Sequence, residues 1–158
     1  MKKPIFLIII GLVGFFAEVI GSNFGILFGE YKYLNNLGPK LFNVPVLLMA
    51  LWITSVYGAY SIALKVTKNK WLIALISAIL CTALDILIEP LCKDLGYWAW
   101  KDSVGIYNFV CWFILAFLMS NFLSINRIQP QKEAIINYFW QIIFFLFINF
   151  SLYGELQY

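Results

Sequence analysis

Five long apolar runs alternate with shorter polar or aromatic connections along this chain. The runs cover residues 4–22, 44–64, 71–89, 104–124 and 134–153, and each is close to the roughly 20 residues that a helix needs to cross a bilayer. No internal repeat is evident, and the connections 65–70 and 125–133 are short and polar. The pattern predicts an all-α integral membrane protein with about five transmembrane helices and one domain, residues 1–158.

The composition agrees with this prediction. Of the 158 residues, 63% are hydrophobic and 12% are charged, whereas soluble domains carry about 25% charged residues. The net charge of +3 lies in short connections, where positive residues orient a membrane protein, so we expect no nucleic-acid partner. The first run contains Glu18 and no cleavage site follows it, which predicts a retained span rather than a signal peptide.

The residue types exclude several kinds of catalytic centre. The chain has no histidine, and Cys81, Cys92 and Cys111 are widely spaced. A haem held by histidine, a histidine-based di-iron site and a Ser-His-Asp triad are therefore excluded. The cysteines are expected to pack as small hydrophobic side chains. We predict no metal site.

Positive charges in short connections favour the cytoplasmic side of a membrane. The N-terminus and the second and fourth connections hold Lys2, Lys3, Lys65, Lys68, Lys70, Arg127 and Lys132. The opposite side holds only Lys32, Lys40, Lys93 and Lys101. This bias predicts an inner-membrane protein with its N-terminus inside and its C-terminus outside. The two aromatic connections, 25–45 and 90–103, then lie together on the outer side.

The connection 25–45 is unlike a flexible linker, which would be rich in Ser, Lys and Glu. It holds large side chains among its glycines and prolines, namely Phe28, Tyr31, Tyr33, Leu37, Leu41 and Phe42. We expect it to form a folded lid at the membrane surface.

Three carboxyl groups within the apolar runs need an explanation, because a charge at the centre of a span costs about 2.5–3.5 kcal/mol. Glu18 shares one helix face with glycines at positions 11, 14 and 21, a small-residue stripe that predicts a helix–helix contact. Asp85 and Glu89 are neighbours on one face of the third helix, which Pro90 ends or kinks. All three acids are predicted to lie in the outer half of the bilayer, beneath the aromatic connections.

Two interpretations of these acids remain open. In one, they lie at the interface, hydrated or paired with Lys32, Lys40, Lys93 or Lys101. In the other, they form a buried acid site, where Asp85 and Glu89 cannot both ionise cheaply and share a proton at neutral pH. A carboxyl group that keeps its proton can act as a general acid.

Aromatic and amide side chains surround the same end. The rings fit either an interfacial belt or a pocket for a long polyene whose π faces stabilise a carbocation. They are Tyr31, Tyr33, Trp52, Tyr97, Trp98, Trp100, Tyr107 and Trp112. Asn23 and Asn108 fit either a helix cap or the orientation of a water or carboxyl group. The uncharged fifth run predicts a lipid-facing helix.

Several spaced motifs together resemble one known family. They are the segment 28–52 (FGEYKYLNNLGPKLFNVPVLLMALW), Glu18 with Gly21, Asp85, Glu89-Pro90, GYWAW at 96–100, and Asn108-Phe109 with Trp112. This pattern is similar to the carotenoid biosynthesis membrane family, which includes bisanhydrobacterioruberin hydratase and carotenoid 1,2-hydratase. The chain departs from it at Glu89, where the family more often has Asp, at Cys111, and in lacking a proline before Asn108. It is also short at the N-terminus, which leaves open a minimal member, a changed activity, or a need for a partner subunit or homo-oligomer.

The resemblance implies a hydratase without cofactor or metal that adds water across a terminal C=C bond of a linear carotenoid. On this hypothesis Asp85 and Glu89 deliver a proton to the lipophilic polyene, and Glu18 orients or deprotonates the attacking water. The predicted substrate-binding residues are Tyr31, Tyr33, Trp52, Trp98, Trp100, Asn108 and Trp112.

Two other functions are compatible with the sequence. A lycopene-cyclase-like isomerase would also protonate a polyene, but it would close a ring instead of capturing water. A non-catalytic membrane subunit or small transporter is the third possibility. Acids that gather near one end, rather than being strung through a span, argue against a proton pathway.

Overall fold

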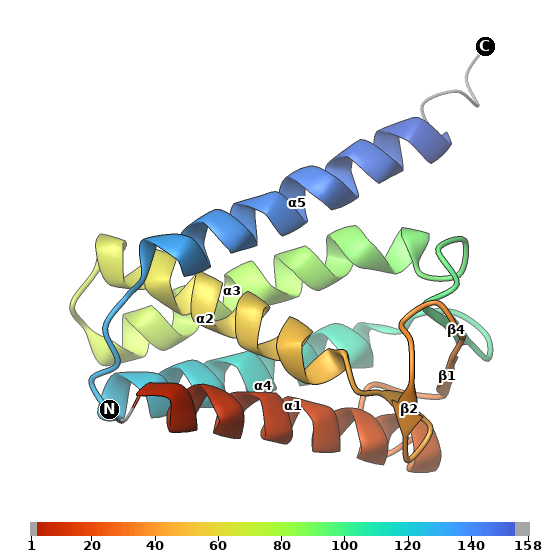
Figure 1. Ribbon diagram of the computed structural model, residues 1–158, viewed down its shortest axis with the longest axis horizontal. Coiled ribbons are helices and arrows are strands. Elements are labelled where there is room, and N and C mark those ends of the chain that lie inside the picture. The colour runs from red at the N-terminus through yellow and green to blue at the C-terminus, as the bar shows by residue number, and fades with distance from the viewer. Residues whose placement is uncertain (1–2, 154–158) are drawn as a thin grey trace.

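The computed structural model describes residues 3–153 and is built mainly from long helices (Figure 1). They are α1 (Lys3–Phe24), α2 (Leu48–Val66), α3 (Lys70–Ile88), α4 (Ile106–Ile125) and α5 (Lys132–Tyr153). All five are long and apolar enough to cross a membrane. The predicted all-α membrane fold with five spans is therefore confirmed.

Two short antiparallel strand pairs lie at one end of the bundle, on the right in Figure 1. Strand β1 (Tyr31–Tyr33) pairs with β4 (Trp98–Trp100), and β2 (Lys40–Leu41) pairs with β3 (Val44–Pro45). The first pair joins the α1–α2 connection to the α3–α4 connection. The two aromatic connections thus form one cap on one side of the protein, as the sequence predicts.

Helix α2 begins at Leu48, later than the predicted start at residue 44. Residues 44–45 form strand β3 of the β2–β3 hairpin instead, and the turn residues Phe42 and Asn43 have φ angles of 52° and 66°. Two successive positive φ values are the geometry of a two-residue type I′ turn. Because the hairpin strand β3 is as apolar as the helix, hydropathy alone does not mark this boundary.

Helix α3 ends at Ile88, and the chain continues as one 3₁₀ turn, η1 (Glu89–Leu91). Pro90 lacks the N–H group that the next helical hydrogen bond needs, so the α-helix stops here, as predicted. The break leaves Glu89 at the rim of the bundle and the fully buried Asp85 one turn below it.

Glycines on α1 allow this helix to lie very close to α2. A Cβ atom added at Gly14 would be 2.2 Å from Cγ of Trp52, and one at Gly11 would be 3.0 Å from the carbonyl oxygen of Met49. The Trp52 ring therefore occupies the space that a side chain at position 14 would need. This contact is the one that the small-residue stripe predicts, and the same packing turns Glu18 inward, where it is 4% exposed.

Helix α5 lies along α2 and α3 and diverges from them towards its C-terminal end (Figure 1). Tyr138 anchors it, since its side chain is 1% exposed and its hydroxyl donates to the carbonyl oxygen of Leu80 at 2.8 Å. Large apolar side chains cover its exposed surface, including Phe139, Trp140, Ile143, Phe147 and Phe150. Such a surface suits the lipid contact predicted for the fifth run.

The connections rich in positive charge lie at the end opposite the cap (Figure 1). The orientation predicted from them, with the N-terminus inside and the C-terminus outside, remains a prediction. Met1, Lys2 and the last residue, Tyr158, lie outside the described part of the chain.

We expect Gly14→Ala to lower the free energy of unfolding by about 1–3 kcal/mol, because the added methyl group overlaps the Trp52 ring. Thermal unfolding in detergent measures the change. Gly105→Ala is the matched control, because a Cβ atom there would have its nearest neighbour at 3.9 Å. Equal stability of the two variants would contradict the close α1–α2 contact.

Candidate active site

Glu18 is a buried carboxyl group that accepts three hydrogen bonds. Its Oε2 atom accepts from the hydroxyls of Tyr31 at 2.5 Å and Tyr33 at 2.7 Å. Its Oε1 atom accepts from Nε1 of Trp52 at 3.1 Å. Donors to both oxygen atoms replace much of the hydration that a buried carboxyl group loses.

The two tyrosines act as donors over the whole physiological pH range. Burial, reinforced by the neighbouring Glu18 carboxylate, raises the pKa of Tyr31 and of Tyr33 well above the ordinary value of a phenol. Both hydroxyls therefore keep their protons. They come from alternate positions of β1, so their side chains point to the same face of the strand.

A second group of acids lies across from Glu18. The Oε2 atom of Glu89 accepts from Nε1 of Trp100 at 2.7 Å and from Nε1 of Trp98 at 3.4 Å. The Asn108 amide donates to Oδ2 of Asp85 at 2.7 Å and to Oε1 of Glu89 at 3.3 Å. One amide group thus bridges the two carboxyls. The other oxygen of Asp85, Oδ1, is buried and has no hydrogen-bond partner among the described residues.

The β1–β4 ribbon connects the two groups of acids. Tyr31 faces Trp100 and Tyr33 faces Trp98 in the strand register, with ring centroids 5.1 Å and 6.1 Å apart. The tyrosines of β1 bind Glu18, and the tryptophans of β4 bind Glu89. Each strand therefore supplies the hydrogen-bond donors of one acid, and the pairing of the strands fixes the positions of the two acids relative to each other.

Trp52 and Trp112 form a second aromatic support. Their rings are stacked, with centroids 4.1 Å apart and planes 13° from parallel. Trp52 also donates to Glu18, so this stack links α1, α2 and α4 at the level of the site.

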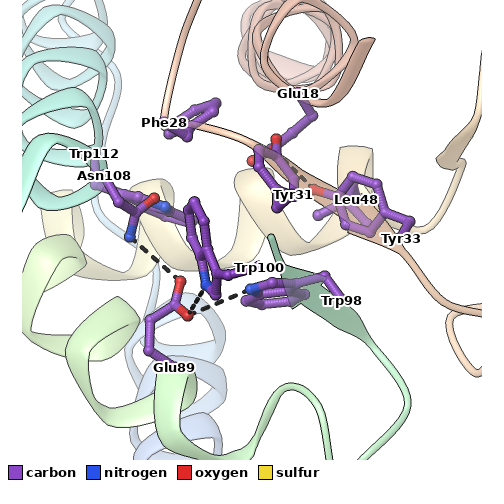
Figure 2. A pocket seen from close by; sticks show the side chains of 10 residues that line it. All are labelled: Glu18, Phe28, Tyr31, Tyr33, Leu48, Glu89, Trp98, Trp100, Asn108 and Trp112. Carbon is purple, nitrogen blue, oxygen red and sulfur yellow. Dashed lines mark hydrogen bonds between the residues drawn. The ribbon is translucent and has the colours of Figure 1, made fainter. Parts of the chain in front are cut away.

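A cavity of about 30 Å³ separates the two groups of acids. Glu18 and Glu89 both line it, and aromatic rings surround it (Figure 2). The other lining residues are Phe28, Tyr31, Tyr33, Leu48, Trp98, Trp100, Asn108 and Trp112. A cavity needs about 10–15 Å³ to hold one water, so one or two water molecules fit here.

The structure assigns different places to the residues that the sequence singles out. Glu18, Glu89, Asn108 and most of the predicted aromatic residues line the cavity. Asp85 and Trp52 do not line it, but they contact the lining residues Asn108 and Glu18. Phe28 and Leu48 line it but were not predicted as site residues. Phe28 could have been identified from the sequence by its place in the aromatic connection. Nothing in the sequence distinguishes Leu48 from its apolar neighbours.

Other polar residues near the cap have structural contacts. Asn23 donates to the carbonyl oxygens of Val19 and Phe42 and accepts from Asn43, so it ties α1 to the hairpin turn and does not reach the cavity. Lys101 pairs with Glu30 on the surface, and within residues 4–152 no ion pair joins a lysine to Glu18, Asp85 or Glu89. Lysine pairing is therefore not what keeps these acids buried.

Comparison with known families gives one match. Residues 2–157 match the sequence model of a family described as "Carotenoid biosynthesis protein". The match extends well beyond the segment 18–112 that carries the motifs. Comparison with curated proteins and with solved structures finds no match.

We expect Tyr33→Phe to lower the free energy of unfolding by about 1.5–3 kcal/mol, the usual contribution of a hydrogen bond to a charged group. Tyr107→Phe is the control, because its exposed hydroxyl donates to the neutral carbonyl oxygen of Ile26 and should contribute about 1 kcal/mol or less. Thermal unfolding in detergent compares the two. In a Glu18→Gln background, the loss caused by Tyr33→Phe should shrink. An undiminished loss there would show that Tyr33 does not act through the Glu18 carboxylate.

Proposed function

The chain belongs to the carotenoid biosynthesis protein family, and on this premise we propose that it adds water across a terminal C=C bond of a linear carotenoid. One observation carries the proposal. Two carboxyl groups, Glu18 and Glu89, line the same water-sized cavity, together with several aromatic rings. Acid-catalysed hydration needs a proton donor, a shelter for a cation, a water and a base, and these residues supply the protein groups.

The first step is proton transfer to the polyene. Glu89 lines the cavity and is the group that meets the double bond. Asp85 does not line the cavity, but the Asn108 amide joins it to Glu89. Two carboxyls linked in this way hold one proton between them more readily than two negative charges. The carboxyl proton and the π electrons of the double bond form a new C–H bond, and the neighbouring carbon becomes a tertiary cation.

The second step is capture of that cation by water. Trp98 and Trp100 border the cavity, and the π electrons of these rings can stabilise positive charge. A water beside Glu18 forms the new C–O bond with an oxygen lone pair and gives its proton to the Glu18 carboxylate. Return of this proton to the Asp85/Glu89 pair through solvent completes the cycle, with one water consumed for each double bond.

The polyene must enter next to this water. The cavity is too small for the end of a carotenoid, so the ring side chains have to move when the substrate binds. A lipophilic substrate reaches the site from the bilayer. Space for water beside both acids favours hydration over ring closure, which uses no water.

We expect expression in a lycopene-producing bacterium to yield pigments heavier than lycopene by the mass of one water for each hydrated end. Glu89→Gln removes the donated proton and should reduce this product at least about 100-fold, the lower bound for a general acid. Asp85→Asn should also reduce it, because it breaks up the pair that shares the proton. Mass spectrometry of the extracted pigments gives the yields.

Glu30→Gln is the matched control. It makes the same Glu-to-Gln change at an exposed position where Glu30 pairs with Lys101, and its yield should be unchanged once the amount of protein in the membrane is equal. A product with the mass of lycopene but a changed absorption spectrum would instead indicate a cyclase. Full hydration by both Asp85→Asn and Glu89→Gln would refute the assignment of the acid.

A further inference from the structure

The end of the bundle opposite the cap contains a second cavity with a different character. It has a volume of about 240 Å³ and lies between the α2–α3 and α4–α5 connections. Four cationic side chains line it, namely Lys65, Lys68, Lys70 and Arg127. We call it the basic pocket. The other polar residues that line it are Tyr60, Ser124 and Gln129.

No acidic side chain lines the basic pocket. The ion pair between Lys101 and Glu30 belongs to the cap, at the other end of the bundle. Lys70 lies 5.2 Å from the centroid of the Trp71 ring, a contact that leaves its charge uncompensated. Four like charges around one hollow repel each other, and an anion in the hollow would relieve this repulsion.

The wall that carries Arg127 is held in place by hydrogen bonds to α2. The hydroxyl of Tyr60 donates to the carbonyl oxygen of Ile128 at 2.9 Å, and that of Tyr57 donates to the carbonyl oxygen of Gln129 at 2.7 Å. Arg127 itself has a φ of 53°, a left-handed conformation that few non-glycine residues adopt. This connection is thus a fixed structure that presents a guanidinium group, not a loose polar tail.

We propose that the basic pocket binds a phosphate-bearing anion, with the headgroup of an anionic phospholipid as its main source. A guanidinium group pairs with two phosphate oxygens at once, and ammonium groups add point charges around it. The pocket lies where α2 and α4 end and α3 begins, the level at which a bilayer places its headgroups. Free phosphate offers the same chemistry from solution.

The test is thermal unfolding of the full chain in detergent, titrated separately with phosphatidylglycerol, phosphatidylcholine and sodium phosphate. The variant is K65Q/K68Q, which removes two exposed charges of the basic pocket. The matched control is K93Q/K132Q, which removes two exposed charges outside it. At about 1 kcal/mol for each lysine, K65Q/K68Q should need roughly 30-fold more phosphatidylglycerol for the same shift in Tm, and the control should respond like the unmodified chain.

Each outcome decides between the sources or against the proposal. A shift with phosphatidylglycerol that K65Q/K68Q weakens and K93Q/K132Q keeps supports the lipid headgroup. A shift with sodium phosphate, weakened by the same variant, supports the anion site with a soluble ligand. Equal weakening in both double variants, equal shifts with phosphatidylglycerol and phosphatidylcholine, or no shift with any probe would overturn it.

Discussion

The burial of Glu18 is the constraint on which the cap depends. A carboxylate inside an apolar bundle is stable only if protein donors replace the water that it loses. Helix α2 supplies one donor, Trp52, and the other two come from the connection that follows α1, through Tyr31 and Tyr33. The connection is therefore held down by the acid beneath it. This explains why so aromatic a segment forms a strand here.

The alternation of side chains along β1 and β4 also organises the second half of the site. A strand of three residues exposes alternate side chains on one face, and each strand of the ribbon uses this alternation to direct two ring donors at one carboxyl group. The register that pairs Tyr31 with Trp100 fixes Glu18 and Glu89 on either side of a single cavity. The bundle below needs only to bring two helix ends to the same rim, which the topology of α1 and α3 ensures.

Much of this arrangement can be predicted from the sequence, because local patterns encode it. Apolar runs mark the five helices, Pro90 marks the end of α3, and the glycine stripe marks the face that turns Glu18 inward. The shared rim of the acids follows from counting spans. The start of α2 does not follow, since an apolar hairpin strand and an apolar helix have the same hydropathy. The ribbon register and the bridging role of Asn108 depend on contacts between segments far apart in the chain, which a single sequence does not encode locally.

The order of the partners along the chain has a consequence for how the protein is made. Glu18, Tyr31, Tyr33 and Trp52 are all present once the first two spans have left the ribosome, so the donors of this acid can gather around it early in synthesis. The Glu89 cluster must wait for Trp98, Trp100 and finally Asn108 on α4. The nascent protein thus gathers the donors of its first buried acid before those of its second, and the cavity between the acids is completed only when the fourth helix arrives.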